Sequence, residues 1–421
     1  MQQDRQTSAF WRFLAAGGLT NLGDGVATLV WTWLATRLTR DPFLISLMPV
    51  ALRLPWFLFA IPAGLVTDRV SRKALVLAMD LARALAFAVA ALVLWQALPL
   101  APPPDEGVSA PGLFLALAAC AVVIGVAEVF RDTAAQTLLP SLVDRTRLEA
   151  ANARFATVEI LGNTLAGPAL GAFLIAAFLP LPFVLNAAAY LLAAGLVAGL
   201  VVQQRATRGA RRHWRQEFTE ASGFLLAQPT LRMLAIFTGV FNGLHQMVVV
   251  GLVLFAQEVL GLGARAYGLA LSAGAGGGLL AGLIAAPLIA RVGGARLAQM
   301  SSALIVLAYL AIPLTGGAVG LALCLAGFSF LGLLWDTVSI SYRQRAVPDE
   351  MRGRVNSLYR MASWGMMPVG LLVSGLLVDL GADILPRAQA LMLPFVFAGV
   401  GVAVMTALAW RGIGRGFSAA P

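Results

Sequence analysis

Charged residues are scarce in this sequence of 421 residues: only 12% are Asp, Glu, Lys or Arg. Soluble domains carry about 25% charged and about 45–50% apolar residues. Here 59% of the residues are hydrophobic, and the mean hydropathy is +0.83. These values exclude a water-soluble enzyme, a disordered chain and a secreted disulfide scaffold. They are typical of an all-α protein that crosses a membrane many times.

Cysteine is also rare, and the sites that cysteine and histidine usually build are missing. Cys120 and Cys324 both lie in apolar runs, so we interpret them as packing residues and not as a disulfide or metal site. No His/Cys/Asp cluster has metal-ligand spacing, and no Ser/His/Asp order indicates a nucleophile. No G-x-x-x-x-G-K-S/T loop is present to bind ATP. The sequence therefore predicts no enzyme, no metal and no cofactor.

Twelve apolar runs are each long enough to cross a bilayer, which takes about 20 helical residues. They fall as six runs, a polar interval and six more, at residues 10–36, 43–66, 74–98, 112–136, 152–178, 182–202, 232–257, 265–290, 297–315, 317–340, 357–378 and 388–410. We predict one six-helix bundle in 1–202, a basic cytoplasmic linker in 203–231 and a second bundle in 232–421. The N-terminus has no small-residue cleavage site, so the first helix is expected to be retained.

Lysine occurs once, as Lys73, and arginine supplies the rest of a net charge of +10. In a soluble protein such a charge suggests nucleic-acid binding, but here the basic residues follow the loops. If the N-terminus is cytoplasmic, 21 of the 30 basic residues lie in cytoplasmic segments or at the cytoplasmic ends of spans, and four lie in outer loops or at the outer ends of spans. The positive-inside rule therefore predicts that both termini are cytoplasmic. No nucleic-acid partner is expected.

The two predicted bundles repeat each other in sequence. At an offset of 221, Asn21 and Asp24 fall on Asn242 and His245. Further matches at offsets of 222 and 204 join Arg69 to Arg291, Asp132 to Asp336, and Gly171 to Gly375. Paired six-helix repeats of this kind occur in secondary transporters, whose binding site lies near the bilayer midplane between the repeats.

The loop between the second and third spans reads G-L-V-T-D-R-V-S-R-K over residues 64–73. It resembles the signature loop of the major facilitator superfamily, with Ser71 in the place of a glycine. We expect Gly64 to let a neighbouring helix approach closely, and the basic side chains to latch onto carboxylates of adjacent helices. The alternative is a simple positive-inside anchor. The predicted gating residues are Gly64, Asp68, Arg69, Arg72, Lys73, Asp132, Arg291 and Asp336.

Wider features resemble the branch of that superfamily that contains enterobactin exporters and macrolide efflux proteins. The first span contains N-L-G-D-G at 21–25, and V-P-D-E-M-R-G-R-V stands at 347–355. The fifth span reads G-N-T-L-A-G-P-A-L-G-A over 162–172, similar to the glycine-proline motif of antiporters. Its predicted key residues are Gly162, Gly167, Pro168 and Gly171. The resemblance implies efflux but names no substrate.

Ionisable residues inside membrane spans are costly, so each is a candidate site. We expect Asp24 and Arg53, on neighbouring spans at similar depth, to form a pair in which a proton or the substrate competes for the carboxylate. The alternative is a static pair that fixes helix packing. Glu128 is a second candidate for protonation. Asp80 and Arg83, three residues apart, are expected to pair locally.

Other candidates line the predicted central cavity. His245 repeats Asp24 and either exchanges protons or acts as a neutral hydrogen-bonding group. Glu159 is expected in the inner vestibule, and two tryptophans are expected at the cavity. The full set of proton-coupling and substrate candidates is Asn21, Asp24, Arg53, Glu128, Glu159, Asn242, His245, Trp335 and Trp364.

The expected function is proton-coupled efflux of an amphiphilic small molecule, such as a drug, a macrolide or a siderophore, by alternating access. The proton motive force is the expected energy source, and the partners are the substrate, protons and the lipid bilayer. A monomer in the bacterial cytoplasmic membrane is expected. The alternatives are an uptake symporter or lipid transporter of the same fold and, less consistent with the short termini, a sensor that transports nothing.

Overall fold

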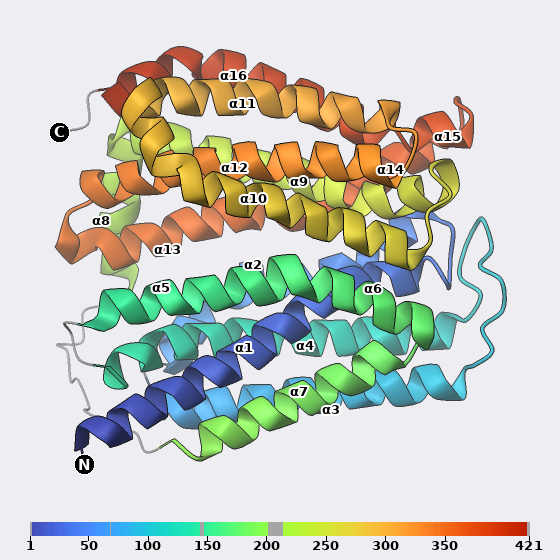
Figure 1. Cartoon of the computed structure of the whole chain (residues 1–421), viewed down its shortest axis with the longest axis horizontal. Coiled ribbons are helices and arrows are strands. Elements are labelled where there is room, and N and C mark those ends of the chain that lie inside the picture. Colours follow the sequence, from blue (N-terminus) through green and yellow to red (C-terminus); the bar gives the residue numbers. More distant parts are fainter. Residues whose placement is uncertain (1, 68, 144–146, 201–213, 419–421) are drawn as a thin grey trace. The chain divides into compact units, whose positions relative to one another are not determined.

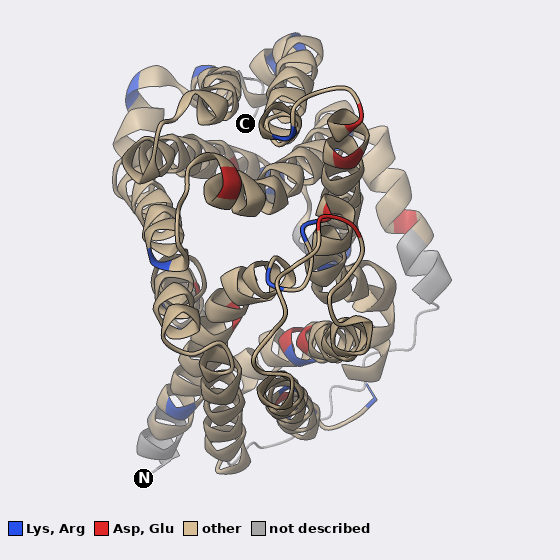
Figure 2. Ribbon diagram, turned by 90° about the vertical axis from the view of Figure 1, so that its right-hand side faces the viewer, with Lys and Arg blue, Asp and Glu red and all other residues tan. Residues whose placement is uncertain are grey.

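The structure is a computed structural model that describes residues 2–67, 69–143, 147–200 and 214–418. Its regular elements in these ranges are all helices (Figure 1). Twelve helical stretches are long and apolar enough to cross a membrane, which confirms the predicted number of spans. Charged residues are sparse along the ribbons (Figure 2).

The first six spans are formed by α1 (Gln2–Ala35), α2 (Pro42–Thr67), α3 (Arg72–Gln96), α4 (Pro111–Leu138) with the 3-10 turn η1 (Leu139–Ser141), the broken fifth span α5 (Leu148–Glu159), η3 (Ile160–Ala166) and α6 (Gly167–Ala177), and α7 (Leu181–Ala198). The short helix α8 (Trp214–Ala227) occupies part of the predicted linker. Residues 201–213 of that linker lie outside the described residues.

The last six spans are α9 (Pro229–Leu254) with η4 (Phe255–Val259), α10 (Ala264–Val292), α11 (Gly294–Ala311) with η5 (Ile312–Leu314), α12 (Ala318–Ala346), the broken span α13 (Asp349–Gly365) and α14 (Met367–Ala382), and α15 (Arg387–Ala390) with α16 (Leu393–Ser418). The helices α12 and α16 continue several residues beyond the predicted runs. They do so because their arginine-bearing ends remain helical after the apolar pattern stops.

The chain divides into two compact units. The first contains Met1–Thr207 and Gly263–Ser272, and the second contains Arg208–Leu262 and Ala273–Pro421. Corresponding spans pack together within each unit: the third packs against the fourth and the sixth, and the first packs against the fifth. In the first unit these pairs are α3–α4, α3–α7 and α1–α6, and in the second they are α11–α12, α11–α16 and α9–α14.

The fifth span is not a continuous α-helix, and its proline explains why. Pro168 has no backbone N–H, so it cannot donate to a carbonyl of the preceding turn. The backbone widens just before it into the π-helical segment η3, in which the N–H of Gly167 donates to the carbonyl of Gly162. π-helical turns often occur at functional sites. The interruption lies within the glycine-proline motif and next to α1.

The two cysteines are free, as the sequence predicts. Cys120 is buried in α4, and Cys324 is half-buried in α12. Among the described residues, no group of three His, Cys, Asp or Glu side chains is placed to hold a metal ion.

Candidate functional site

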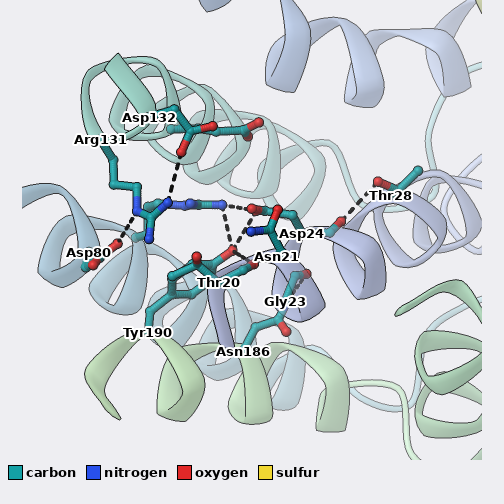
Figure 3. A network of polar contacts seen from close by, with 12 residues as sticks. Thr20, Asn21, Gly23, Asp24, Thr28, Asp80, Arg131, Asp132, Asn186 and Tyr190 are labelled. Atoms are coloured by element: carbon teal, nitrogen blue, oxygen red, sulfur yellow. Dashed lines mark hydrogen bonds and ion pairs between the residues drawn. The ribbon is translucent and has the colours of Figure 1, made fainter. Parts of the chain in front are cut away.

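Asp24 stands at the centre of a polar network inside the first unit (Figure 3). Its carboxylate accepts a hydrogen bond from Nη2 of Arg83 on α3 and another, 2.7 Å long, from the hydroxyl of Tyr190 on α7. Arg83 Nη2 also donates to the Tyr190 hydroxyl at 2.6 Å, and its guanidinium lies 4.1 Å from the centre of the Tyr190 ring. One carboxylate therefore joins α1, α3 and α7.

The neighbour of Asp24 allows α1 and α7 to approach this closely. A Cβ atom on Gly23 would lie 3.2 Å from the Tyr190 hydroxyl and 3.3 Å from Oδ1 of Asn186. With no side chain in that place, the Asn186 amide donates to the carbonyl of Gly23 at 3.0 Å. The N-L-G-D-G sequence thus supplies both the acid and the space for its partner.

The predicted pairing of Asp24 with Arg53 is wrong. Arg53 lies on α2, which packs against α4, and its Nη1 is 3.7 Å from Oε1 of Glu128 on that helix. The Trp56 indole N–H donates to the same oxygen at 3.3 Å. The prediction matched Asp24 and Arg53 by their depth along the spans. In the structure the two side chains point from their helices towards different neighbours.

The predicted local pair of Asp80 with Arg83 is also wrong. Both side chains are fully buried on α3, but Arg83 turns to α1 and Asp80 turns to α4. Asp80 Oδ1 lies 3.3 Å from Nε of Arg131, and Nη1 of Arg131 donates to Oδ1 of Asp132 at 3.1 Å (Figure 3). Arg131 is therefore shared by two carboxylates.

Three neighbouring ion-pair clusters on α1 to α4, counted together as one network, contain more carboxylates than guanidinium groups, and the surplus carboxylate lies at Arg131. The acids are Asp24, Asp80, Glu128 and Asp132, and the bases are Arg53, Arg83 and Arg131. If every acid is ionised, the network carries one negative charge without a matching cation. Burial of an unbalanced charge is expensive, so binding of one proton or one cation balances the network.

The glycine-proline motif of the fifth span packs directly against the backbone of α1. A Cβ atom on Gly167 would lie 2.5 Å from Cα of Gly25, and one on Gly171 would lie 2.9 Å from the carbonyl oxygen of Val26. A Cβ atom on Gly162 would lie 3.0 Å from the backbone N of Leu22. Pro168 is buried at the same contact. These glycines hold the helix segment that carries Asp24 against the fifth span.

In the second unit, His245 on α9 contacts the third helix of its bundle, as Asp24 does in the first. Its Nδ1 is 3.1 Å from the Tyr309 hydroxyl on α11, and its ring stacks on Phe328 with 4.5 Å between centroids. Asn242, one turn earlier, donates to the carbonyl of Ser363 at 3.0 Å. The counterpart Asn21 donates instead to its own helix, at the carbonyl of Gly17.

The Tyr309→Phe substitution is expected to lower the free energy of unfolding by about 1 kcal/mol. It removes the hydrogen-bond partner of the half-buried His245 ring, and hydrogen bonds inside membrane proteins have values of this size. Thermal melting of the detergent-purified protein measures the loss. An unchanged melting temperature would show that the contact between His245 and Tyr309 does not stabilise the unit.

The tryptophans do not share one environment. Trp335 is only 2% exposed and stacks on Phe237 at 4.5 Å within the hydrophobic core of the second unit, so its expected place at a cavity is wrong. Trp364 is half-buried beside Arg360, whose guanidinium lies 5.3 Å from the ring centre. Glu159 is exposed at the end of α5, directly before the π-helical segment.

The basic residues between α2 and α3 bind backbone carbonyls, where the sequence predicts carboxylates. Arg72 Nη1 donates to the carbonyl of Thr137 at 3.0 Å. Lys73 Nζ donates to the carbonyls of Ala198 and Leu200, each at 2.7 Å. These carbonyls lie at the ends of α4 and α7, where a helix has no donors of its own left. The two cations therefore cap helix C-termini, a position that suits positive charge.

The remaining gating residues are placed as follows. Asp68 lies outside the described residues, and Arg69 is exposed. A Cβ atom on Gly64 would meet no atom within 4 Å, so the expected close approach of another helix to this glycine is wrong within the first unit. Asp132 pairs with the adjacent Arg131, and not with the basic residues of the loop. In the second unit, Arg291 and Asp336 are exposed on α10 and α12.

Replacement of the single lysine tests the capping interaction. Lys73→Met keeps a long side chain but removes both hydrogen bonds to the end of α7, so the free energy of unfolding is expected to fall by about 2 kcal/mol. Thermal melting in detergent measures this loss, and Arg296→Met, which removes an exposed cation at the start of α11, is the control. Equal melting temperatures for the two variants would contradict the capping role.

Sequence reasoning missed Arg83 and Tyr190 as partners of Asp24, and Arg131 as the partner of Asp80. A signal was available for the arginines, because a guanidinium buried in a span requires a carboxylate at the same depth. For Tyr190 there was none, since a tyrosine in an apolar run resembles any other packing residue.

Comparisons with known proteins agree with this architecture. The family model of the Major Facilitator Superfamily matches residues 13–371. No curated protein matches the chain. Among solved structures, a bacterial homologue of the human lysosomal transporter Spinster, in an inward-facing and unoccupied conformation, shares 15% identity at a TM-score of 0.74, with 98% of each chain covered.

Two further structures show the same fold. The nucleoside transporter NupG shares 15% identity at a TM-score of 0.70, over 96% of this chain and 98% of that one. A bacterial homologue of the iron transporter ferroportin, in an inward-facing state, shares 16% identity at a TM-score of 0.66, over 97% and 100% of the two chains. Likeness at these identities concerns the fold alone. With a family match over most of its length and twelve candidate membrane spans, the chain belongs to the Major Facilitator Superfamily and is a transporter, not an enzyme.

Proposed function

We propose that this chain is a proton-coupled exporter of amphiphilic small molecules, of the class of drugs, macrolides and siderophores. It acts as a monomer in the bacterial cytoplasmic membrane, with both termini in the cytoplasm, and the proton motive force drives it. The observation that carries the proposal is the excess of one carboxylate over the guanidinium groups in the three ion-pair clusters of α1 to α4, one of which contains Asp24.

A network with one unmatched carboxylate favours uptake of a single positive charge. A proton is the smallest such charge, and among the described residues no group of three His, Cys, Asp or Glu side chains is placed to hold a metal cation in its place. Among the described residues the network supplies only carboxylates and guanidinium groups as ionisable partners besides Tyr190. Proton binding inside a membrane span is the usual role of such carboxylates in pumps and transporters.

We assign the coupling proton to Asp24. Its side chain is 17% exposed, so a proton can reach it from solvent, as it can reach Glu128 at 16% and Asp132 at 33% but not the fully buried Asp80. It also joins three helices, so its protonation changes what holds α1 to α3 and α7. Glu128 joins α4 only to α2, through the 3.7 Å contact with Arg53 and the Trp56 indole, and is therefore the weaker candidate.

Support for the export direction comes from the fifth span. Its sequence resembles the glycine-proline motif of antiporters, and its glycines contact the segment of α1 that carries Asp24. A proton-dependent movement of α1 therefore acts directly on the contact made by this motif. The branch resemblance in the N-L-G-D-G and V-P-D-E-M-R-G-R-V segments favours the same direction.

Accumulation of four probes tests the direction and the substrate class together. Cells that express the chain are loaded with ethidium, rhodamine 6G, Hoechst 33342 or erythromycin, with and without a protonophore. Lower accumulation that the protonophore abolishes is the expected result for at least one probe. Energy-dependent accumulation above that of control cells would favour the uptake symporter instead. No change with any probe would contradict the proposed substrate class.

A further inference from the structure

Arg83 and Asp80 both contain polar atoms that the network leaves unused. In the part of the chain that the structure describes, Arg83 Nε and Nη1 are buried without a hydrogen-bond partner, and so are both carboxylate oxygens of Asp80. The side chains of both residues are 0% exposed. Buried polar groups in proteins nearly always have partners, so such atoms call for an explanation.

The two groups lie within reach of each other. Asp80 and Arg83 are three residues apart on α3, and residues at this spacing share one face of a helix. Arg83 uses only Nη2 for Asp24 and Tyr190. Asp80 has only the ionic contact of 3.3 Å with Nε of Arg131, without a hydrogen bond. At this spacing, rotation of the two side chains can bring them together without movement of α3.

We propose that Arg83 is a two-position group, which pairs with Asp24 while Asp24 is ionised and turns to Asp80 when Asp24 binds a proton. The inference rests on the proposed proton coupling, because the proton on Asp24 is what releases Arg83. Asp80 is then a positioning residue for the proton on Asp24, since it receives the guanidinium that protonation of Asp24 leaves without a counter-charge.

The charges of the network match this exchange. With Asp24 neutral, three carboxylates remain for three guanidinium groups, and each acid has one base. Arg83 takes Asp80, Arg131 retains Asp132 alone, and Arg53 retains Glu128. Without the exchange, protonation of Asp24 leaves a fully buried guanidinium unpaired, which is strongly destabilising.

Several other ionisable groups lie around Asp24 and interact with its charge. Those that act on it directly or electrostatically are Arg83 and Asp80 on α3, Glu128 on α4, Glu159 on α5 and Tyr190 on α7. Only Arg83 and Tyr190 among these donate hydrogen bonds to Asp24. Arg83 is therefore the cation whose position depends on the charge of Asp24.

A double-mutant cycle on the full-length protein in detergent tests the exchange at a fixed, mildly alkaline pH. Asp24→Asn imitates the protonated acid, and Asp80→Asn removes the second acceptor. Each single variant leaves Arg83 one carboxylate, so each is expected to melt only slightly below the wild type. The double variant leaves none, so its melting temperature is expected to fall roughly 2 °C or more below the sum of the single losses. Additive losses would overturn the proposal.

Two further measurements apply if the double variant does not fold. Asp24→Asn combined with Asp80→Glu retains an acceptor on α3 and is expected to melt near Asp24→Asn alone. Asp80→Asn alone is expected to lose melting temperature more steeply than the wild type as the pH falls, because the released Arg83 has no acceptor. If Asp24→Asn combined with Asp80→Glu also fails to fold, the exchange is overturned. It is equally overturned if the melting temperatures of Asp80→Asn and the wild type fall in parallel as the pH is lowered.

The cycle separates this inference from the proposed function. Glu258→Gln breaks the ion pair with Arg387 in the second unit, so its combination with Asp24→Asn is expected to be additive and serves as the control. Suppose that the melting losses are non-additive but that Asp24→Asn still exports in a protonophore-sensitive way. Proton coupling at Asp24 is then refuted, and the exchange is retained. If the melting losses are additive and Asp24→Asn has lost export, the exchange is refuted and proton coupling at Asp24 is retained.

Discussion

Asp24→Asn is expected to reduce protonophore-sensitive export at least about tenfold while the protein still folds and inserts. Asparagine fills the same volume and can still accept from Tyr190, but it carries no charge and cannot exchange a proton. The network then has equal numbers of carboxylates and guanidinium groups at every pH. Export of the probe that the wild type moves, measured in energised cells or in proteoliposomes with an imposed pH gradient, gives the loss.

Two controls accompany this variant. Glu258→Gln removes a glutamate that pairs with Arg387 at 2.6 and 3.0 Å in the second unit, and export is expected to remain near wild type. Glu128→Gln removes the acid that keeps Arg53 as its partner and is expected to have a smaller effect than Asp24→Asn. If Glu128→Gln abolishes export and Asp24→Asn does not, the coupling proton belongs to Glu128.

Gly167→Val is expected to cause the largest loss of stability, about 3 kcal/mol or more. The added Cβ atom would lie 2.5 Å from Cα of Gly25 and 2.6 Å from the carbonyl oxygen of Gly162. Both are backbone atoms, which cannot turn aside as a flexible side chain does. The fifth span therefore has to separate from α1, and the helix that carries Asp24 is displaced. Melting in detergent, together with export of the probe, measures both consequences.

Gly195→Val is the matched control for that substitution. Gly195 lies in α7, is exposed, and a Cβ atom placed on it meets no atom within 4 Å. The same change from glycine to valine then tests only helix propensity, which amounts to less than about 1 kcal/mol. Equal melting temperatures for the two variants would contradict the close packing between α1 and the fifth span.

The spans were predictable because a single physical requirement determines them. A helix must be apolar over the thickness of the bilayer, so the twelve runs could be read from hydropathy, and the ends differ from the structure by only a few residues at most spans. The repeat was also predictable, because matching residues occur in the same order in both halves of the sequence. Depth along a span follows directly from counting residues.

The partners of the charged residues were not predictable in the same way. Depth places both Arg53 and Arg83 near Asp24, but only the packing of α1 against α7 and of α3 between α4 and α7 selects Arg83. The rotation of each helix about its axis decides this selection, and it depends on contacts such as the one between Gly23 and Tyr190. Trp335 was misplaced for the same reason, because its helix turns that side chain into the core.

The motif between α2 and α3 indicated the right superfamily, but the contacts predicted for its basic residues were wrong. Spacing indicated cations at the end of a span, and carboxylates on adjacent helices were the partners expected of them. In the structure, Lys73 donates instead to two backbone carbonyls at the end of α7. A sequence pattern shows that a helix ends, but it does not show which side chain caps that end.

The most direct test of the account is ethidium accumulation in cells that express the wild type, Asp24→Asn or Glu258→Gln, each measured with and without a protonophore. Low accumulation is expected in the wild type and in Glu258→Gln, both reversed by the protonophore, and high accumulation is expected in Asp24→Asn under either condition. Export by Asp24→Asn that equals the wild type and remains sensitive to the protonophore would contradict proton coupling at Asp24.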